Sequence, residues 1–220
     1  MSEPQSPAAV PSRTDGPAWR IAGAAGGWLL FTFFTTLFLR AALAVLFLGG
    51  YCASGGPYAI AVECPRAVVF VVPWSIFLTL AAVFAGTMLQ RGFGTPLLSW
   101  AWGLAFGALG IGSIVGGVIA GGVWNFIGGA MFLLFSIPVL VFEFRQSPLR
   151  FFIGATNLRE QGFIVRTGGL KRMFRRKPSK QDYVQEVEAT VADGVIALLS
   201  TVPFAVLGAW LGWVTFDALG

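Results

Sequence analysis

The sequence from Leu97 to Phe142 reads LLSWAWGLAFGALGIGSIVGGVIAGGVWNFIGGAMFLLFSIPVLVF and contains no charged residue. One membrane span needs about 20 apolar residues to cross about 30 Å of hydrocarbon. This stretch is about twice that length, so we predict two spans that form a helical hairpin inside a bilayer. The turn of the hairpin is predicted near Gly116–Gly122, where Gly-Gly pairs flank three apolar residues.

The composition of the whole chain indicates a membrane protein. The 220 residues are 56% hydrophobic and only 11% charged, whereas soluble domains contain about 25% charged residues. A soluble fold of this size has too little interior to bury so much apolar surface. The predicted fold class is therefore all-α, a polytopic membrane helical bundle with about five transmembrane helices.

The polarity of successive segments predicts two regions. Residues 1–20 contain four prolines and mostly small or polar side chains, which predicts a disordered cytoplasmic tail. Residues 21–220 are predicted to form a single transmembrane helical domain. The predicted spans cover residues 28–50, 67–89, 97–116, 123–143 and 195–216, and a basic cytoplasmic segment covers residues 145–190.

Basic residues and cysteines agree on the orientation of the spans. Ten of the fifteen Lys and Arg lie between Arg145 and Lys180, and positive charge beside spans marks the cytoplasmic side. The amino terminus is then inside and the carboxyl terminus outside. This orientation places Cys52 and Cys64 outside, where thiols oxidise. A structural disulfide between them is favoured, and a reactive redox pair is the alternative.

Several function classes lack the residues that they need. The net charge of +5 does not indicate nucleic-acid binding, because the basic residues that flank spans already have a topological role. The chain has no His and only two Cys, so neither a metal site nor a cofactor is predicted. Phosphate-binding glycine loops, serine nucleophile motifs and paired carboxylates are absent from the sequence, so we do not expect an enzyme.

Arg40 is the most informative single residue, because it interrupts the first predicted span. It lies ten residues before Gly50, at a depth of about 15 Å and close to the midplane of the bilayer. A cation there costs at least about 2.5–3.5 kcal/mol. Glu143 and Asp217 are expected at opposite interfaces, where they are poorly placed to pair with it. Arg40 and Asn125 are therefore a candidate substrate site or helix-packing site.

Glycines recur at a spacing that favours close helix packing. Small residues four positions apart let two helix backbones approach each other. The pairs are Gly103/Gly107, Gly112/Gly116 and Gly117/Gly121. They predict packing inside the bundle, with a homo-oligomeric interface as the alternative and a pore lining as a weaker one. Trp28 and Trp124 are predicted to anchor their spans at the membrane interface.

The basic segment carries candidate docking residues. Residues 148–159 have an apolar stripe typical of a helix lying in the interface, and Ser179 is predicted to cap a later helix. Between them lie Lys171, Arg172, Arg175, Arg176 and Lys177. These cations are predicted to bind anionic lipid headgroups, at about 1 kcal/mol per residue, or to dock an acidic partner. The alternative is that they only fix the topology.

A family resemblance rests on three short motifs. Gly55–Ile60 with the sequence GGPYAI, the pair Cys64-Pro65, and the triplet Trp124–Phe126 resemble an uncharacterised group of multi-pass membrane proteins from actinobacteria. In that group an acidic residue often follows the second and third motifs, whereas this chain has Arg66 and the neutral run Ile127–Gly129 there. The resemblance implies a bacterial inner membrane location and no chemistry.

These patterns predict a non-enzymatic integral protein of the bacterial inner membrane, an accessory or scaffold subunit of an envelope complex. A small transporter or channel with a site near Arg40 is the alternative, and an enzyme acting on lipids is a weaker one. The expected partners are the lipid bilayer, anionic lipids, and either a second copy or another membrane protein. A polar cavity shared by Arg40 and Asn125 would favour transport.

Overall fold

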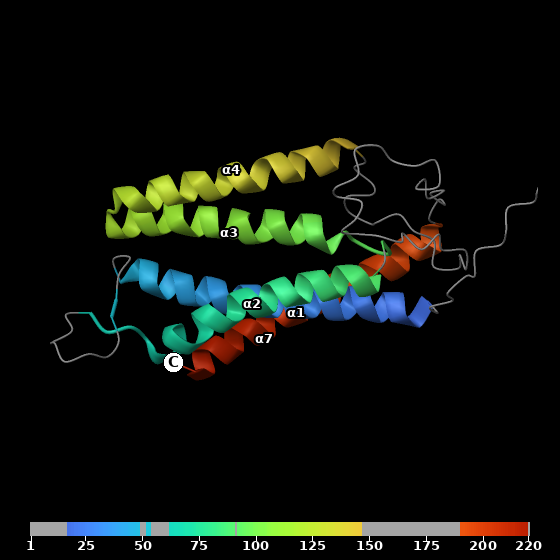
Figure 1. Cartoon of the computed structure of the whole chain (residues 1–220), viewed down its shortest axis with the longest axis horizontal. Coiled ribbons are helices and arrows are strands. Elements are labelled where there is room, and N and C mark those ends of the chain that lie inside the picture. Colours follow the sequence, from blue (N-terminus) through green and yellow to red (C-terminus); the bar gives the residue numbers. More distant parts are fainter. Residues whose placement is uncertain (1–16, 49–51, 54–61, 91, 147–189, 220) are drawn as a thin grey trace, which may run out of the picture.

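The computed structural model describes residues 17–48, 52–53, 62–90, 92–146 and 190–219. These residues form five helices: α1 (Pro17–Phe47), α2 (Arg66–Gln90), α3 (Leu97–Ala120), α4 (Val123–Gln146) and α7 (Val191–Leu219) (Figure 1). All five are long and apolar enough to cross a membrane. The predicted all-α, multi-pass architecture is therefore confirmed.

The helices run side by side between two ends of the bundle (Figure 1). We call one the disulfide end, where α1 and α7 finish and α2 begins. The other is the Arg20 end, where α1 and α7 begin and α2 leads into α3. Helices α1 and α7 are therefore parallel, and α2 runs antiparallel to both.

Helix α1 is the centre of the bundle, because it packs extensively against both α2 and α7 and also contacts α3. One buried cluster lies toward the disulfide end and another joins α1 to α3 nearer the Arg20 end. Their buried members are Leu37, Ala41, Ala67, Val68, Val71 and Phe216 in the first, and Trp28, Phe31, Val83, Leu97 and Ala101 in the second. We call α1, α2 and α7 the three-helix unit.

Glycines bring the helices of the three-helix unit into backbone contact. A Cβ on Gly27 of α1 would lie 2.8 Å from the Cα of Gly86 in α2. A Cβ on Gly208 of α7 would lie 2.2 Å from the carbonyl oxygen of Leu29 in α1. No side chain larger than hydrogen fits at these distances, so glycine at these positions permits the observed separation of the helices.

Helices α3 and α4 form the predicted hairpin. The turn is at Gly121 and Gly122, inside the predicted region, and Gly121 has φ 73°, a left-handed conformation that favours glycine. Two side chains bond across the hairpin: the Ser136 hydroxyl donates to the Gly103 carbonyl at 2.8 Å, and the Trp102 indole donates to the Phe135 carbonyl at 3.2 Å. Among the described helices, α4 packs against α3 alone.

The first span differs from its prediction at both ends. Helix α1 begins at Pro17, inside the region predicted to be a disordered tail, and ends at Phe47. Proline is well suited to the first helical turn, since its missing N–H would have no partner there. Residues 1–16 lie outside the described part of the chain. Trp28 is not an interface anchor, because it is 3% exposed and packs inside the bundle.

Candidate functional site

The contacts of Arg40 form the candidate site at the disulfide end. Arg40 makes an ion pair with Asp217. Its guanidinium carbon lies 3.8 Å from the ring centre of Trp213 and 5.4 Å from that of Phe216. Both rings are within the range of cation–π attraction. The cation on α1 therefore meets one carboxylate and two aromatic rings, all of them from α7.

The spacing of residues in α7 explains this arrangement. Phe216 and Asp217 follow Trp213 by three and four positions, so both lie on the same face of α7 as Trp213. Gly208 and Gly212 precede Phe216 at intervals of four residues. A Cβ on Gly212 would lie 2.6 Å from the carbonyl oxygen of Phe33. The glycines thus bring α7 against the backbone of α1, and the next turn of α7 receives the Arg40 side chain.

The expectation that Asp217 is poorly placed to pair with Arg40 is wrong. It treated the first span as reaching residue 50 and the last as ending at residue 216. Helix α1 instead ends at Phe47, and α7 continues to Leu219. Arg40 is therefore about 10 Å from the end of its helix, at the same level as Asp217.

These contacts place Arg40 in the interface between α1 and α7. The side chain of Arg40 is 28% exposed and that of Asp217 is 51% exposed. The Nε of Arg40 is buried and has no hydrogen-bond partner among the described residues. An arginine binds an anion well when it offers two parallel N–H groups. Here one Nη meets Asp217 and the guanidinium carbon lies over the Trp213 ring, so the group joins α1 to α7.

Asn125 lies in a different helix interface. It is in the first turn of α4, and its backbone N–H donates to the Gly122 carbonyl at 3.1 Å. Its side chain packs against the end of α3, since a Cβ on Gly117 would lie 3.1 Å from the Cβ of Asn125. Because α4 packs against α3 alone, the structure does not bring Asn125 and Arg40 together. Arg40 and Asn125 thus form no shared site.

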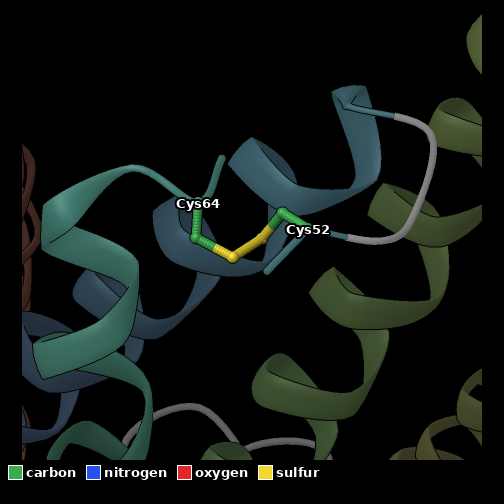
Figure 2. Close-up of a disulfide and its surroundings, with 2 residues drawn as sticks. All are labelled: Cys52 and Cys64. Atoms are coloured by element: carbon green, nitrogen blue, oxygen red, sulfur yellow. A yellow bond between two sulfur atoms is a disulfide. The ribbon is translucent and has the colours of Figure 1, made fainter. Parts of the chain in front are cut away.

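The two cysteines form the predicted disulfide, which links the segment after α1 to the start of α2 (Figure 2). The Cα atoms of Cys52 and Cys64 are 4.9 Å apart. Beside the bond, the Ala53 N–H donates to the Val62 carbonyl at 3.0 Å, and the Cys64 N–H donates to the Ala53 carbonyl at 3.1 Å. These backbone bonds hold the two strands of the loop together next to the sulfur atoms.

The predicted glycine pairs face neighbouring helices of the same chain. Gly103 and Gly107 face α4, and Gly112 and Gly116 face α1. Of the last pair, Gly117 packs against Asn125 and Gly121 forms the hairpin turn. Gly103 lies against Leu140 and Gly107 against Ser136, whereas Gly112 lies against Leu43 and Gly116 against Leu46. This arrangement fits packing inside the bundle.

Other sequence-predicted elements lie outside the described residues. These are the interfacial helix at 148–159, the Ser179 cap, and the cations Lys171, Arg172, Arg175, Arg176 and Lys177. The described chain resumes at Thr190, which caps α7. The Thr190 hydroxyl accepts the N–H of Asp193 at 3.2 Å, and the Asp193 carboxylate accepts the N–H and the hydroxyl of Thr190 at 2.9 and 2.7 Å. This reciprocal arrangement is a capping box.

A buried polar cluster at the Arg20 end was not predicted. Five polar side chains from α1, α2, α7 and the loop between α2 and α3 gather there, and none is more than 5% exposed. They are Arg20, Gln90, Thr95, Asp193 and Thr201. The Gln90 amide and the Trp28 indole both donate to the Thr95 carbonyl, at 2.6 and 3.3 Å. We call these five residues the buried polar cluster.

The sequence contains a signal for this cluster that composition alone hides. Arg20 and Ala24 are four residues apart, and so are Asp193, Ala197 and Thr201, so each set shares one helix face. Ala24 and Ala197 belong to the same buried group as Phe93. In both helices, a polar residue four positions from a small residue therefore indicates the buried face. Arg20 was not recognised in this way, because the prolines before it predicted a disordered tail.

Among the described residues, no group of three or more His, Cys, Asp or Glu side chains is arranged to hold a metal ion. The chain matches no protein-family model, and neither the curated proteins nor the solved structures that were searched yield a match.

Proposed function

We propose that this protein is a non-enzymatic accessory or scaffold subunit of an envelope complex in the bacterial inner membrane. The observation that carries the proposal is the engagement of Arg40 by Trp213, Phe216 and Asp217. Arg40 is the residue on which a substrate site was predicted. Because its contacts join α1 to α7, they favour a structural role over transport.

Four hydroxyl side chains of the spans support the same proposal. Thr32, Ser75 and Ser200 donate to carbonyls three or four residues earlier in their own helices. Ser136 donates to the facing helix. A conducting path needs polar groups directed toward a lumen, whereas these hydroxyls are directed toward backbone carbonyls.

In this proposal the carboxyl terminus faces outward, and the basic segment faces the cytoplasm beside the Arg20 end. Lys171, Arg172, Arg175, Arg176 and Lys177 would then lie beside anionic lipid headgroups or an acidic partner. Helix α4 offers a partner a complete helix face, because α3 is its single neighbour among the described helices. The docking role of the basic residues rests on the sequence.

The first test is the native mass of the protein after gentle extraction from its own membrane. A single stoichiometric partner that migrates with it is the expected result, and that partner would identify the complex. A pure homo-oligomer or a lone monomer would contradict the accessory role. A homo-oligomer would favour the transporter, to be tested by flux into liposomes.

A second test separates the two roles of Arg40. Removal of one partner of an ion pair leaves an uncompensated charge, whereas replacement of both partners by apolar groups is far less costly. Arg40→Leu should lower the yield of folded protein, and Arg40→Leu combined with Asp217→Leu should restore part of it. Full folded yield of Arg40→Leu, together with loss of a measured flux, would overturn the structural role.

The small transporter remains the second candidate because of one observation. Pro73, Pro138 and Pro203 lie inside α2, α4 and α7, and proline opens the backbone hydrogen bonding of a helix. Breaks of this kind are common where transporter helices bend.

A further inference from the structure

Charged residues mark both ends of α1 and α7 at matching levels. Arg20 and Arg40 are 20 positions apart in α1, and no charged residue lies between them. That separation is about 30 Å along a helix, the thickness of the hydrocarbon core of a bilayer. On α7, Asp217 pairs with Arg40, and Asp193 belongs with Arg20 to the buried polar cluster. These four residues therefore delimit an apolar length of the three-helix unit that matches a bilayer.

The register between α1 and α3 shows where the hairpin lies relative to these charges. A Cβ on Gly27 would lie 3.0 Å from Cδ2 of Leu97, the first residue of α3. A Cβ on Gly116 would lie 3.2 Å from the Cβ of Leu46. Between the two contacts each helix advances by the same number of residues, so α3 runs parallel to α1 in a constant register.

At the disulfide end the hairpin continues well past the Arg40–Asp217 pair. Leu46 is six positions beyond Arg40, and the hairpin turn at Gly121 is five positions beyond Gly116, which lies beside Leu46. The turn is therefore about 15 Å farther along the bundle than Arg40. The residues of the hairpin between the two levels are uncharged.

At the Arg20 end the hairpin stops short by a similar distance. Leu140 of α4 lies against Gly103 of α3, and Glu143 is three residues closer to this end of the bundle. By the register with α1, Glu143 is then about ten residues, or about 15 Å, from the level of Arg20. Arg145 follows on the same helix and is exposed. The apolar part of the hairpin is thus displaced toward the disulfide end at both of its ends.

This displacement makes the apolar surface of the bundle oblique to its helices. Helices α7, α1, α3 and α4 follow one another across the bundle, and the hairpin is shifted toward the disulfide end relative to α7 (Figure 1). A bilayer perpendicular to the helices would place either Glu143 or the Arg40–Asp217 pair in hydrocarbon, which is costly. An offset of about 15 Å across three helix spacings of about 9 Å needs a tilt of about 30°, within the range of 0–40° for membrane helices.

Exposed tryptophans agree with the oblique boundary at the disulfide end. Tryptophan is enriched at the interface between hydrocarbon and water. Trp213 lies beside Arg40, and Trp210 is one turn closer to the centre of the bundle; both are exposed. On the hairpin, the exposed Trp124 directly follows the turn. A boundary at the level of the turn on every helix would leave both tryptophans of α7 deep in the hydrocarbon.

We propose that the lipid bilayer crosses the bundle obliquely, tilted by about 30° from perpendicular to the helices. Phospholipid headgroups at the disulfide end then meet α7 at Arg40 and Asp217, whose side chains are 28% and 51% exposed, but meet the hairpin near its turn. At the Arg20 end they meet the hairpin at Glu143. Arg40 accordingly lies at a surface of the bilayer, whereas the sequence predicted it near the midplane.

Spin labels at lipid-facing positions test the proposal. The two native cysteines are joined in the disulfide, which leaves one added cysteine to label. Leu219 of α7 and Ile111 of α3 are both exposed. Leu219 is two residues past Asp217, and Ile111 precedes Gly112, which lies against Leu43, so the two positions share one level of the bundle. In the oblique bilayer, Leu219→Cys carries its label among headgroups and Ile111→Cys carries it near the centre.

A second pair of positions should show the reverse order. Val206 of α7 and Leu98 of α3 are exposed. Val206 is two residues before Gly208, which meets the backbone of Leu29, and Leu98 follows the residue that contacts Gly27. These two positions therefore share a level closer to the Arg20 end. Here Val206→Cys should carry its label near the bilayer centre, and Leu98→Cys should carry it near the headgroups.

Electron paramagnetic resonance measures the depth of each label. Oxygen concentrates at the bilayer centre and a nickel chelate stays in water, so the ratio of their collision rates rises with depth. In the full chain in vesicles of phosphatidylethanolamine and phosphatidylglycerol, we expect a ratio several-fold higher at Ile111 than at Leu219, and several-fold higher at Val206 than at Leu98. Equal ratios within both pairs would mean a bilayer perpendicular to the helices and would overturn the proposal.

Removal of the ion pair tests whether it sets the boundary on α7. Arg40→Leu combined with Asp217→Leu should let hydrocarbon extend farther along α7, so the ratio at Leu219 should rise at least twofold. Thr32→Val is the matched control, because the Thr32 hydroxyl donates within α1. It should leave the ratio at Leu219 unchanged. An unchanged ratio in the double variant would contradict the placement of headgroups at Arg40 and Asp217.

Discussion

The three-helix unit and the α3–α4 hairpin both contain glycines four residues apart, but the glycines meet different groups. In the three-helix unit, Gly208 and Gly212 of α7 face backbone carbonyl oxygens of α1. In the hairpin, Gly103 faces the flexible end of Leu140. The same sequence spacing therefore gives backbone contact between α7 and α1, and contact with a side chain between α3 and α4. Only the side chain of Leu140 can move to accommodate a larger residue.

The two regions also differ in what holds them together apart from packing. The three-helix unit has the disulfide between α1 and α2 and the Arg40–Asp217 pair between α1 and α7. The hairpin has two hydrogen bonds from side chains to backbone carbonyls, made by Trp102 and Ser136. Hydrogen bonds between membrane helices contribute about 0.6 kcal/mol on average. We therefore expect a substitution in the hairpin to cost less stability than one in the three-helix unit.

Gly208→Ala should have the largest effect. The added methyl group would lie 2.2 Å from the carbonyl oxygen of Leu29, and a helix backbone cannot move aside without separating α1 from α7. We expect a loss of about 3 kcal/mol, the upper range for overpacking. Unfolding in mixed detergent and SDS micelles, followed by circular dichroism, measures this loss. Wild-type stability in Gly208→Ala would show that the two helices are farther apart.

Removal of the disulfide should have the next largest effect. Cys52 and Cys64 are 12 positions apart, and closure of a loop of that size stabilises by about 2–3 kcal/mol in the chain-entropy model. The variant with both cysteines changed to alanine should lose this amount in the same assay. The oxidised wild type should take up no maleimide until it is reduced, and labelling without reductant would contradict the bond.

Gly103→Ala should cost less, about 1 kcal/mol, because the methyl group meets the side chain of Leu140 and not backbone. The difference between the two regions becomes sharp in a double variant. Leu140→Ala removes the clashing atoms, so Gly103→Ala should cost almost nothing in that background. A double-mutant cycle measures the coupling. Additive effects would mean that the hairpin glycine also meets backbone.

Gly26→Ala should have the smallest effect and the opposite sign. No atom lies within 4 Å of a Cβ built on Gly26, although Gly26 precedes Gly27, which touches Gly86. Alanine favours a helix over glycine by about 0.8–1 kcal/mol in peptides, so a gain of up to that amount is expected in the same SDS titration. A loss comparable to that of Gly208→Ala would mean that Gly26 is also a contact position.

The fold could be predicted from the sequence because it depends on long-range composition. A stretch such as Leu97–Phe142 has no charge over twice the length of a span, and the hairpin turn requires its glycines. The pairing of helices could not be predicted in the same way, since every span presents apolar faces of similar character. Gly208 and Gly212 have the spacing of the predicted pairs, but spacing alone does not name the helix that they touch.

The candidate site was predicted in part, for a related reason. Arg40 stood out because a cation within a span is costly, and that cost is independent of the partner. Its partner Asp217 was missed because span ends are uncertain by several residues, and the long side chain of arginine reaches across that interval. Arg20 was missed because prolines before it suggested disorder, although one of them, Pro17, begins α1.

The central position of α1 has a consequence for biosynthesis. Among the described helices, α1 is synthesised first and α7 last. The faces of α1 that contact α2, α3 and α7 are therefore uncovered until those helices have entered the membrane. Until α7 enters, Arg40 lies in the lipid without Asp217 and Trp213, and the carbonyl of Leu29 has no glycine against it. A chain that stops before α7 therefore leaves the Arg40 cation on α1 without its carboxylate and aromatic partners.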